Sequence, residues 1–136
     1  MSHQLIRRIY EQRLSAWAAS RGLRIAYQGV AFDPGDDETY LRAFTLPAGT
    51  GTQTLEGTDR VYTGVFQISI VSPAGNGTGD AEGLVDDLDE LFPTFLRLKQ
   101  GDFEVMVLTP VEPGPAIVDD TTLTVSASFQ YRADRA

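Results

Sequence analysis

The sequence contains no cysteine and a single histidine, His3. A chain without cysteine has no disulfide framework and no thiol nucleophile, and one histidine cannot supply the ligand set of a usual zinc site. We therefore expect no metal and no cofactor. Long apolar runs are also lacking, since no segment approaches the roughly 20 residues that a membrane-spanning helix needs. The first residues carry no apolar signal segment, so we expect no export by that route.

Positive charge is scarce as well. The chain has 11 Lys and Arg against 19 Asp and Glu, a formal net charge of −8. Affinity for nucleic acid depends on cations that displace counterions from phosphates, so this balance argues against nucleic acid as the main partner. A chain of 136 residues with 42% hydrophobic residues is long enough for one folded core, and we treat residues 1–136 as a single domain.

Two segments have apolar residues at helical spacing. The first, residues 4–21, is followed by Gly22 in the position of a C-terminal glycine. Arg13 falls inside its apolar face. Either its stem packs and its guanidinium reaches water, or it forms a partly buried ion pair within the chain or with a neighbouring subunit. The second helix is expected over residues 80–92, with an acidic outer face and Pro93 at its end.

Four segments alternate with the period of a β-strand, namely residues 23–28, 39–46, 60–72 and 122–131. A fifth strand is expected over residues 103–109, which are apolar on both faces and so suit a central position in the sheet. Gly64, inside the strongest of them, predicts a bulge or the close approach of another backbone. Residues 110–120 contain three prolines and are expected to form a loop. The order of elements predicts an α+β fold: a mixed, mostly antiparallel sheet of four to five strands, two helices packed on one face, and a long hairpin arm over 47–57.

No motif points to catalysis. The glycines of Gly75-Asn76-Gly77-Thr78-Gly79 lack the following Lys-Ser/Thr of a phosphate loop, and Asp80 would repel a phosphate. His3 has no evident Ser or Asp partner, and no nucleophile elbow is present. We therefore expect no catalytic residue and no cofactor-binding or metal-binding residue.

Three features instead indicate that neighbours complete the structure. The 60–72 strand is apolar on both faces, the 47–57 arm offers little that could pack, and Phe32 lies in a turn-rich acidic loop where we expect it to be exposed. Strands and loops of this kind suit a protein that forms contacts with other chains.

Several runs of residues together resemble the tail terminator (tail completion) proteins of long-tailed phages and prophages. They are Ile6-Arg7, Trp17-Ala18, Phe32-Asp33-Pro34, Tyr62-Thr63-Gly64-Val65-Phe66-Gln67-Ile68 and Leu91-Phe92-Pro93, and their order and spacing extend over nearly the whole chain. The resemblance implies a structural virion subunit, not an enzyme. It implies a hexameric ring that caps the tail tube, stops tube growth and forms the surface for head joining.

The resemblance also implies partners: further copies of the chain, the tail tube protein and a head-completion or connector protein, with DNA only passing through the lumen and no membrane. The location would be the virion tail, after assembly in the host cytoplasm. A ring needs two unlike surfaces, which a basic first helix and an acidic second helix could supply. The residues expected at protein interfaces are Arg13, Phe32, Thr50, Thr52, Leu55, Glu56 and Arg60.

Two alternatives remain open at this stage. One is another head–tail joining protein, a connector or stopper of similar size. The other is a small ligand-binding α+β domain that uses the concave face of its sheet.

Overall fold

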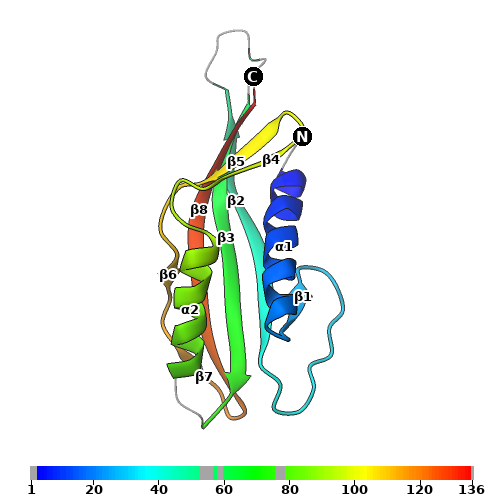
Figure 1. Cartoon of the computed structure of the whole chain (residues 1–136), viewed down its shortest axis with the longest axis vertical. Coiled ribbons are helices and arrows are strands. Elements are labelled where there is room, and N and C mark those ends of the chain that lie inside the picture. The colour runs from blue at the N-terminus through cyan, green and yellow to red at the C-terminus, as the bar shows by residue number, and fades with distance from the viewer. Residues whose placement is uncertain (1–2, 53–56, 58–59, 76–78, 136) are drawn as a thin grey trace.

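The structure is a computed structural model that describes residues 3–52, 57, 60–75 and 79–135. Its elements in chain order are α1 (His3–Ser20), β1 (Arg24–Tyr27), β2 (Tyr40–Gly51), β3 (Arg60–Pro73), α2 (Gly79–Leu91), β4 (Arg97–Gln100), β5 (Phe103–Val107), β6 (Glu112–Pro113), β7 (Ile117–Val118) and β8 (Thr122–Arg135). Both helices form where the apolar spacing predicts them (Figure 1). Neither helix, in the part of the chain that is described, is long and apolar enough to cross a membrane.

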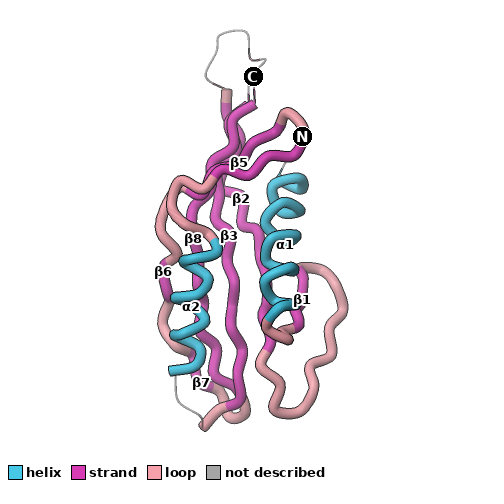
Figure 2. Tube along the Cα trace, viewed as in Figure 1, coloured by secondary structure: helices cyan, strands magenta, loops and turns pink. Residues whose placement is uncertain are grey.

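All the strands belong to one mixed sheet. Its order is β1-β2-β3-β8-β5-β4, and β6 and β7 pair with β8 beyond the end of β5. β1 pairs with β2 in parallel, and the remaining pairs are antiparallel. Residues 103–118 thus act as one interrupted strand along the edge of β8 (Figure 2).

The sheet has eight strands, so the expectation of four to five is wrong. The missed strands carry weak signals. β6 and β7 have two residues each and lie in the proline-containing segment that was expected to be a loop, and β4 is mostly polar. Such segments pair because β8 and β5 offer unpaired backbone groups, whatever side chains the segments carry.

The packing of the helices is also less simple than two helices on one flat face. α1 contacts β1, β2 and β3, and also β4 at the other end of the sheet order. The sheet therefore curls around α1. α2 contacts β3, β8 and β6.

The core lies between the helices and the central strands β3 and β8. The ring of Tyr10 in α1 lies 5.3 Å from that of Phe66, 5.1 Å from that of Phe129 and 5.8 Å from that of Phe92. These four rings are buried, and they join α1 and the end of α2 to the centre of the sheet.

Gly64 lies where two groups approach the β3 backbone closely. A Cβ atom there would come within 2.7 Å of the Leu46 carbonyl oxygen and 2.6 Å of Tyr131 Cζ. The register of β2 shifts between Pro47 and Gly49, next to this position. The predicted close approach of another backbone at Gly64 is confirmed, because the Leu46 carbonyl of β2 makes it. The bulge lies in the partner strand β2, not at Gly64 itself.

Candidate interface at the arm end

Four segments that are distant in sequence meet at one end of the molecule (Figure 1). These are the end of β2, the start of β3, the end of β8 and the β4–β5 hairpin. The register joins them into one row, Gly51–Val61–Asp134–Glu104–Lys99. We call this region the arm end and define it as residues 47–52, 60–63, 97–107 and 130–135.

The base of the expected arm is regular strand. β2 continues to Gly51, whereas the alternating pattern predicted its end at Leu46. Residues 47–51 are exposed, and the sheet ladder holds them through their pairing with β3 from Gly64 to Val61. The Gly and Thr residues there gave no strand signal because their side chains bury nothing, whereas the ladder needs only the backbone.

His3 fastens the start of α1 to this region. Its Nδ1 lies 2.7 Å from the Tyr131 hydroxyl and its Nε2 lies 3.1 Å from Thr50 Oγ1. The imidazole and the ring of Tyr62 also form a T-shaped pair, with ring centres 5.3 Å apart. Burial lowers the pKa of His3, and burial raises the pKa of Tyr131 to about 12. The imidazole therefore favours its neutral form, which can donate to one hydroxyl and accept from the other.

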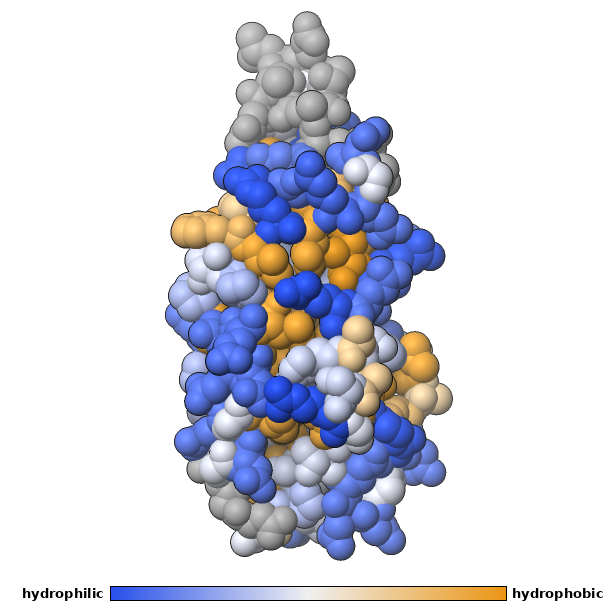
Figure 3. Space-filling model, in the orientation of Figure 1, coloured by the Kyte–Doolittle hydropathy of each residue, from blue (hydrophilic) through white to orange (hydrophobic). Residues whose placement is uncertain are grey.

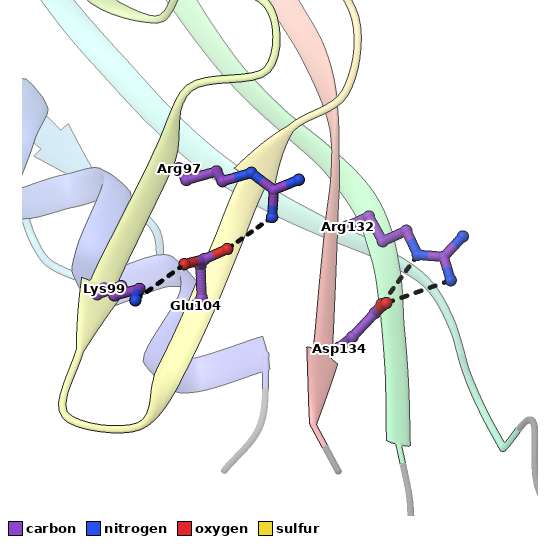
Figure 4. Close-up of polar contacts among 5 residues, drawn as sticks. All are labelled: Arg97, Lys99, Glu104, Arg132 and Asp134. Carbon is purple, nitrogen blue, oxygen red and sulfur yellow. Dashed lines mark hydrogen bonds and ion pairs between the residues drawn. The ribbon is translucent and has the colours of Figure 1, made fainter.

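A cluster of charged side chains covers the neighbouring strands at the arm end (Figure 4). Glu104 in β5 pairs with Arg97 at 2.7 Å and with Lys99 at 3.6 Å, both on β4. Arg132 and Asp134 on β8 pair at 2.9 Å. The hydrogen bond from Arg97 is the main cause of a lowered pKa of Glu104. We call these five residues the charged ladder.

Exposed ion pairs of this kind add little to the stability of a domain. Three cations against two anions give the charged ladder a net positive charge, on a chain whose total is −8. None of these five residues was predicted from the sequence as part of an interface. Their signal is charge at every second position, in Arg97 and Lys99 and again in Arg132 and Asp134, which puts each pair on one face of a strand.

The interface residues expected from the sequence do not all come together. Thr50 and Arg60 lie at the arm end, and Thr52 follows β2 directly and is exposed. The guanidinium of Arg60 donates to the Gly57 carbonyl. Leu55 and Glu56 lie outside the described residues.

Arg13 lies between the two helices and shares a groove with Leu98 of the arm end. Its Nε donates to the Leu91 carbonyl at 2.8 Å, so it binds the negative end of the α2 dipole and forms no ion pair with a described carboxylate. The groove around it is lined by Ile9, Trp17 and Leu98, where apolar surface shows between the helices (Figure 3). Arg13 therefore joins the helices within one chain.

Phe32 is half-buried, and the expectation of an exposed ring is wrong. Its ring lies 4.9 Å from that of Tyr40, and the Arg24 guanidinium lies 4.6 Å from its centre. Arg24 also binds Glu38 through two nitrogens, at 2.7 Å and 2.5 Å. This hydrogen bond is the main cause that lowers the pKa of Glu38 to about 2. These contacts hold the loop together within one chain.

Comparisons with known proteins give the family and the overall similarity of the fold. A family model described as phage tail terminator protein matches residues 5–131. One solved structure has 40% sequence identity and a TM-score of 0.82, with 98% of this chain and 96% of that chain covered. A comparison with curated proteins finds no match.

Proposed function

The chain belongs to the phage tail terminator family, and from this premise we propose that it caps the end of the tail tube as a ring. In that position the ring stops the addition of tube subunits and forms the surface that the head joins. The observation that carries the proposal is the family match over residues 5–131. The match supports a structural role in the virion tail. Assembly in the host cytoplasm is part of the proposal.

The arm end is the part of the molecule that we assign to the tube. Three long strands end there beside the charged ladder, so the surface has a stiff backbone and a defined charge pattern. Such a surface suits docking onto an already assembled protein, because little conformational freedom is lost on contact. The net positive ladder favours a tube surface that presents carboxylates.

The remaining partners follow from the position of the ring. Further copies would lie beside each subunit in a hexamer, a head-completion or connector protein would bind the side away from the tube, and DNA would pass through the lumen. A closed ring requires heterologous contacts, in which one patch meets a different patch of the next subunit.

The role in tail assembly is tested by deleting the gene from the source phage or prophage and imaging the particles by negative-stain electron microscopy. We expect overlong, headless tubes beside filled, tailless heads. Tails of normal length beside unjoined heads would overturn termination in favour of another joining protein. Intact virions would remove the structural role altogether.

The proposed contact between the hairpin arm and the tail tube is tested by replacing residues 53–59 with Asn-Gly. This dipeptide can close a two-residue hairpin between β2 and β3. Residues 48–51 stay in place, because they are paired in β2 and Thr50 contacts His3. We expect an unchanged melting temperature and a loss of tail capping. A variant that melts normally and still gives tails of normal length would contradict the contact.

Arg60→Glu tests the charge at the same end. We expect the variant to fold and to lose infectivity in complementation, because it reverses a cation beside the assigned tube surface. Arg42→Glu is the matched control, since Arg42 is also an exposed arginine of the sheet but lies in β2 far from the arm end. Equal infectivity of the two variants would refute a specific contact of Arg60.

A further inference from the structure

Two unlike flanks lie on opposite edges of the sheet. β1 forms one edge, and α1 contacts it. On the other side of β3, β6 and β7 pair with β8, and α2 contacts β6. Figures 1 and 2 show α1 with β1 on one side of the molecule and α2 with β6 and β7 on the other. We call these the groove flank and the acidic flank.

The groove flank holds an open groove between α1 and the end of β1. Ala16, Ala19, Tyr27 and Val30 supply its apolar lining. Val30 is 62% exposed, which is high for a large apolar side chain. A groove of this kind presents apolar surface that a partner can cover.

The rim of this groove is basic. Arg7 and Arg8 both line it. Arg7 lies 3.9 Å from Glu11, the one carboxylate in the lining, whereas Arg8 has no hydrogen-bond or ion-pair partner within the described ranges. Arg8 is exposed, so its charge is available to a partner.

The acidic flank has the opposite charge. The exposed carboxylates of α2 and of the neighbouring edge are Asp80, Glu82, Asp86, Asp89, Glu90, Glu112, Asp119 and Asp120. The two cations that reach α2 come from the chain's own α1: Arg21 pairs with Asp87 at 2.6 Å and Arg13 binds the last carbonyl. These two contacts leave the outward carboxylates without a cation from the described residues.

Apolar side chains are exposed on this acidic flank. Ile117 and Val118 in β7 are 59% and 68% exposed. Phe95, which follows α2, is 65% exposed and has a φ of +69°, a conformation that bulky residues rarely adopt. Its N–H donates to the Val107 carbonyl at 2.7 Å, which holds the strained backbone. Of the five large apolar side chains that are exposed in the described ranges, only Leu46 lies outside the two flanks.

We propose that the acidic flank of one copy docks on the groove flank of the next copy, with Arg8 facing the carboxylates of α2. The inference rests on the proposed ring and names the two surfaces that close it. A second copy of this chain is the occupant because both complementary surfaces belong to the same chain and lie at opposite edges. An arrangement of this kind repeats from subunit to subunit.

The absence of native cysteine allows a direct test, because engineered thiols are then the only ones in this chain. Val30→Cys and Val118→Cys are combined in one chain and treated with a short bismaleimide, in concentrated purified protein and in isolated tails. We expect a ladder of linked oligomers from the double variant. Each single variant should form no covalently linked oligomers, because a heterologous contact does not bring a residue next to the same residue of another copy. Val30→Cys with Phe95→Cys is the second pair.

Charge reversal separates this contact from chance proximity. Arg8→Glu in the double-cysteine background should lower the yield of linked oligomers by at least roughly tenfold, because like charges then face each other. Asp86→Arg alone should have the same effect. Combining Arg8→Glu with Asp86→Arg in one chain should restore the yield of linked oligomers. Arg60→Glu, on an exposed arginine at the arm end and outside both flanks, should leave the yield of linked oligomers in purified protein unchanged.

The outcomes separate the contact from the function. Efficient linking of the single variants would show an isologous contact and overturn the proposal, as would the absence of a ladder in both purified protein and tails. If the double-cysteine variant forms linked oligomers but deletion of the gene leaves tails of normal length, the contact is supported and the terminator role is refuted. The terminator phenotype without a ladder would support the role and refute the contact.

Discussion

Replacing Gly64 with alanine tests the packing that joins the arm end to the core. The new Cβ would lie 2.7 Å from the Leu46 carbonyl oxygen and 2.6 Å from Tyr131 Cζ, and contacts this close require something to move. Neither neighbour moves easily. Leu46 is paired with Val65 in the β2–β3 ladder, and the Tyr131 ring is buried with its hydroxyl bonded to His3.

The sign of the effect depends on two opposing contributions. Removing a glycine from a strand lowers the entropy of the unfolded chain and stabilises by up to about 1 kcal/mol. Overpacking a rigid site costs about 3 kcal/mol, the upper part of its usual range. The net loss of unfolding free energy is therefore about 2 kcal/mol, which lowers the melting temperature of a domain of this size by roughly 8 °C.

Thermal unfolding followed by circular dichroism measures this difference. Gly83→Ala is the matched control, because Gly83 lies within α2 and a Cβ there meets nothing within 4 Å. Alanine is the better helix former, so this variant should gain about 0.5–1 kcal/mol. A Gly64→Ala protein that melts at or above the wild-type temperature would refute the argument from close approach.

Three further predictions concern single polar groups. Tyr10→Phe should match or exceed the stability of the wild type, because the buried Tyr10 hydroxyl has no hydrogen-bond partner among the described residues. Tyr131→Phe should instead lower the melting temperature, because it removes a hydroxyl that is hydrogen-bonded to His3. Arg13→Ala should cost about 2 kcal/mol in denaturant unfolding, because it strips a charged donor from the last carbonyl of α2, and Arg8→Ala should cost almost nothing; equal losses would contradict this. Glu38 should titrate near pH 2 by NMR, so the stability from its pairing is present above its ordinary pKa of 4.5 and lost as the pH falls toward 2; a midpoint near 4.5 would show that the loop is open.

The pKa of His3 gives a pH dependence of its own. Because burial lowers the pKa of the folded imidazole below 6.5, the unfolded chain takes up the proton first as the pH falls. The contribution of His3 to stability is therefore complete above pH 6.5 and is lost as the pH falls below it. His3→Gln should flatten this part of the stability profile. An equal fall in melting temperature for both proteins between pH 7 and 5 would contradict it.

The sequence by itself determined the elements whose side chains carry a period. Both helices and the long strands β3 and β8 were predictable because one face of each must be buried, and the spacing of their apolar residues reflects that requirement. The close approach of another backbone at Gly64 was also predictable, because a glycine within a strong strand signals such a contact. The family resemblance came from the same ordered runs, and the family match confirms it.

Only the tertiary structure decided which residues meet. The extra strands β4, β6 and β7 and the extension of β2 to Gly51 depend on backbone pairing, which no side-chain pattern records. His3 finds Thr50 and Tyr131 across 47 and 128 positions of sequence. Arg13 binds a helix carbonyl, and Phe32 lies under Arg24. The physical reason is common to all: local pattern reports which groups need burial or partners, and the folded chain alone decides where those partners are.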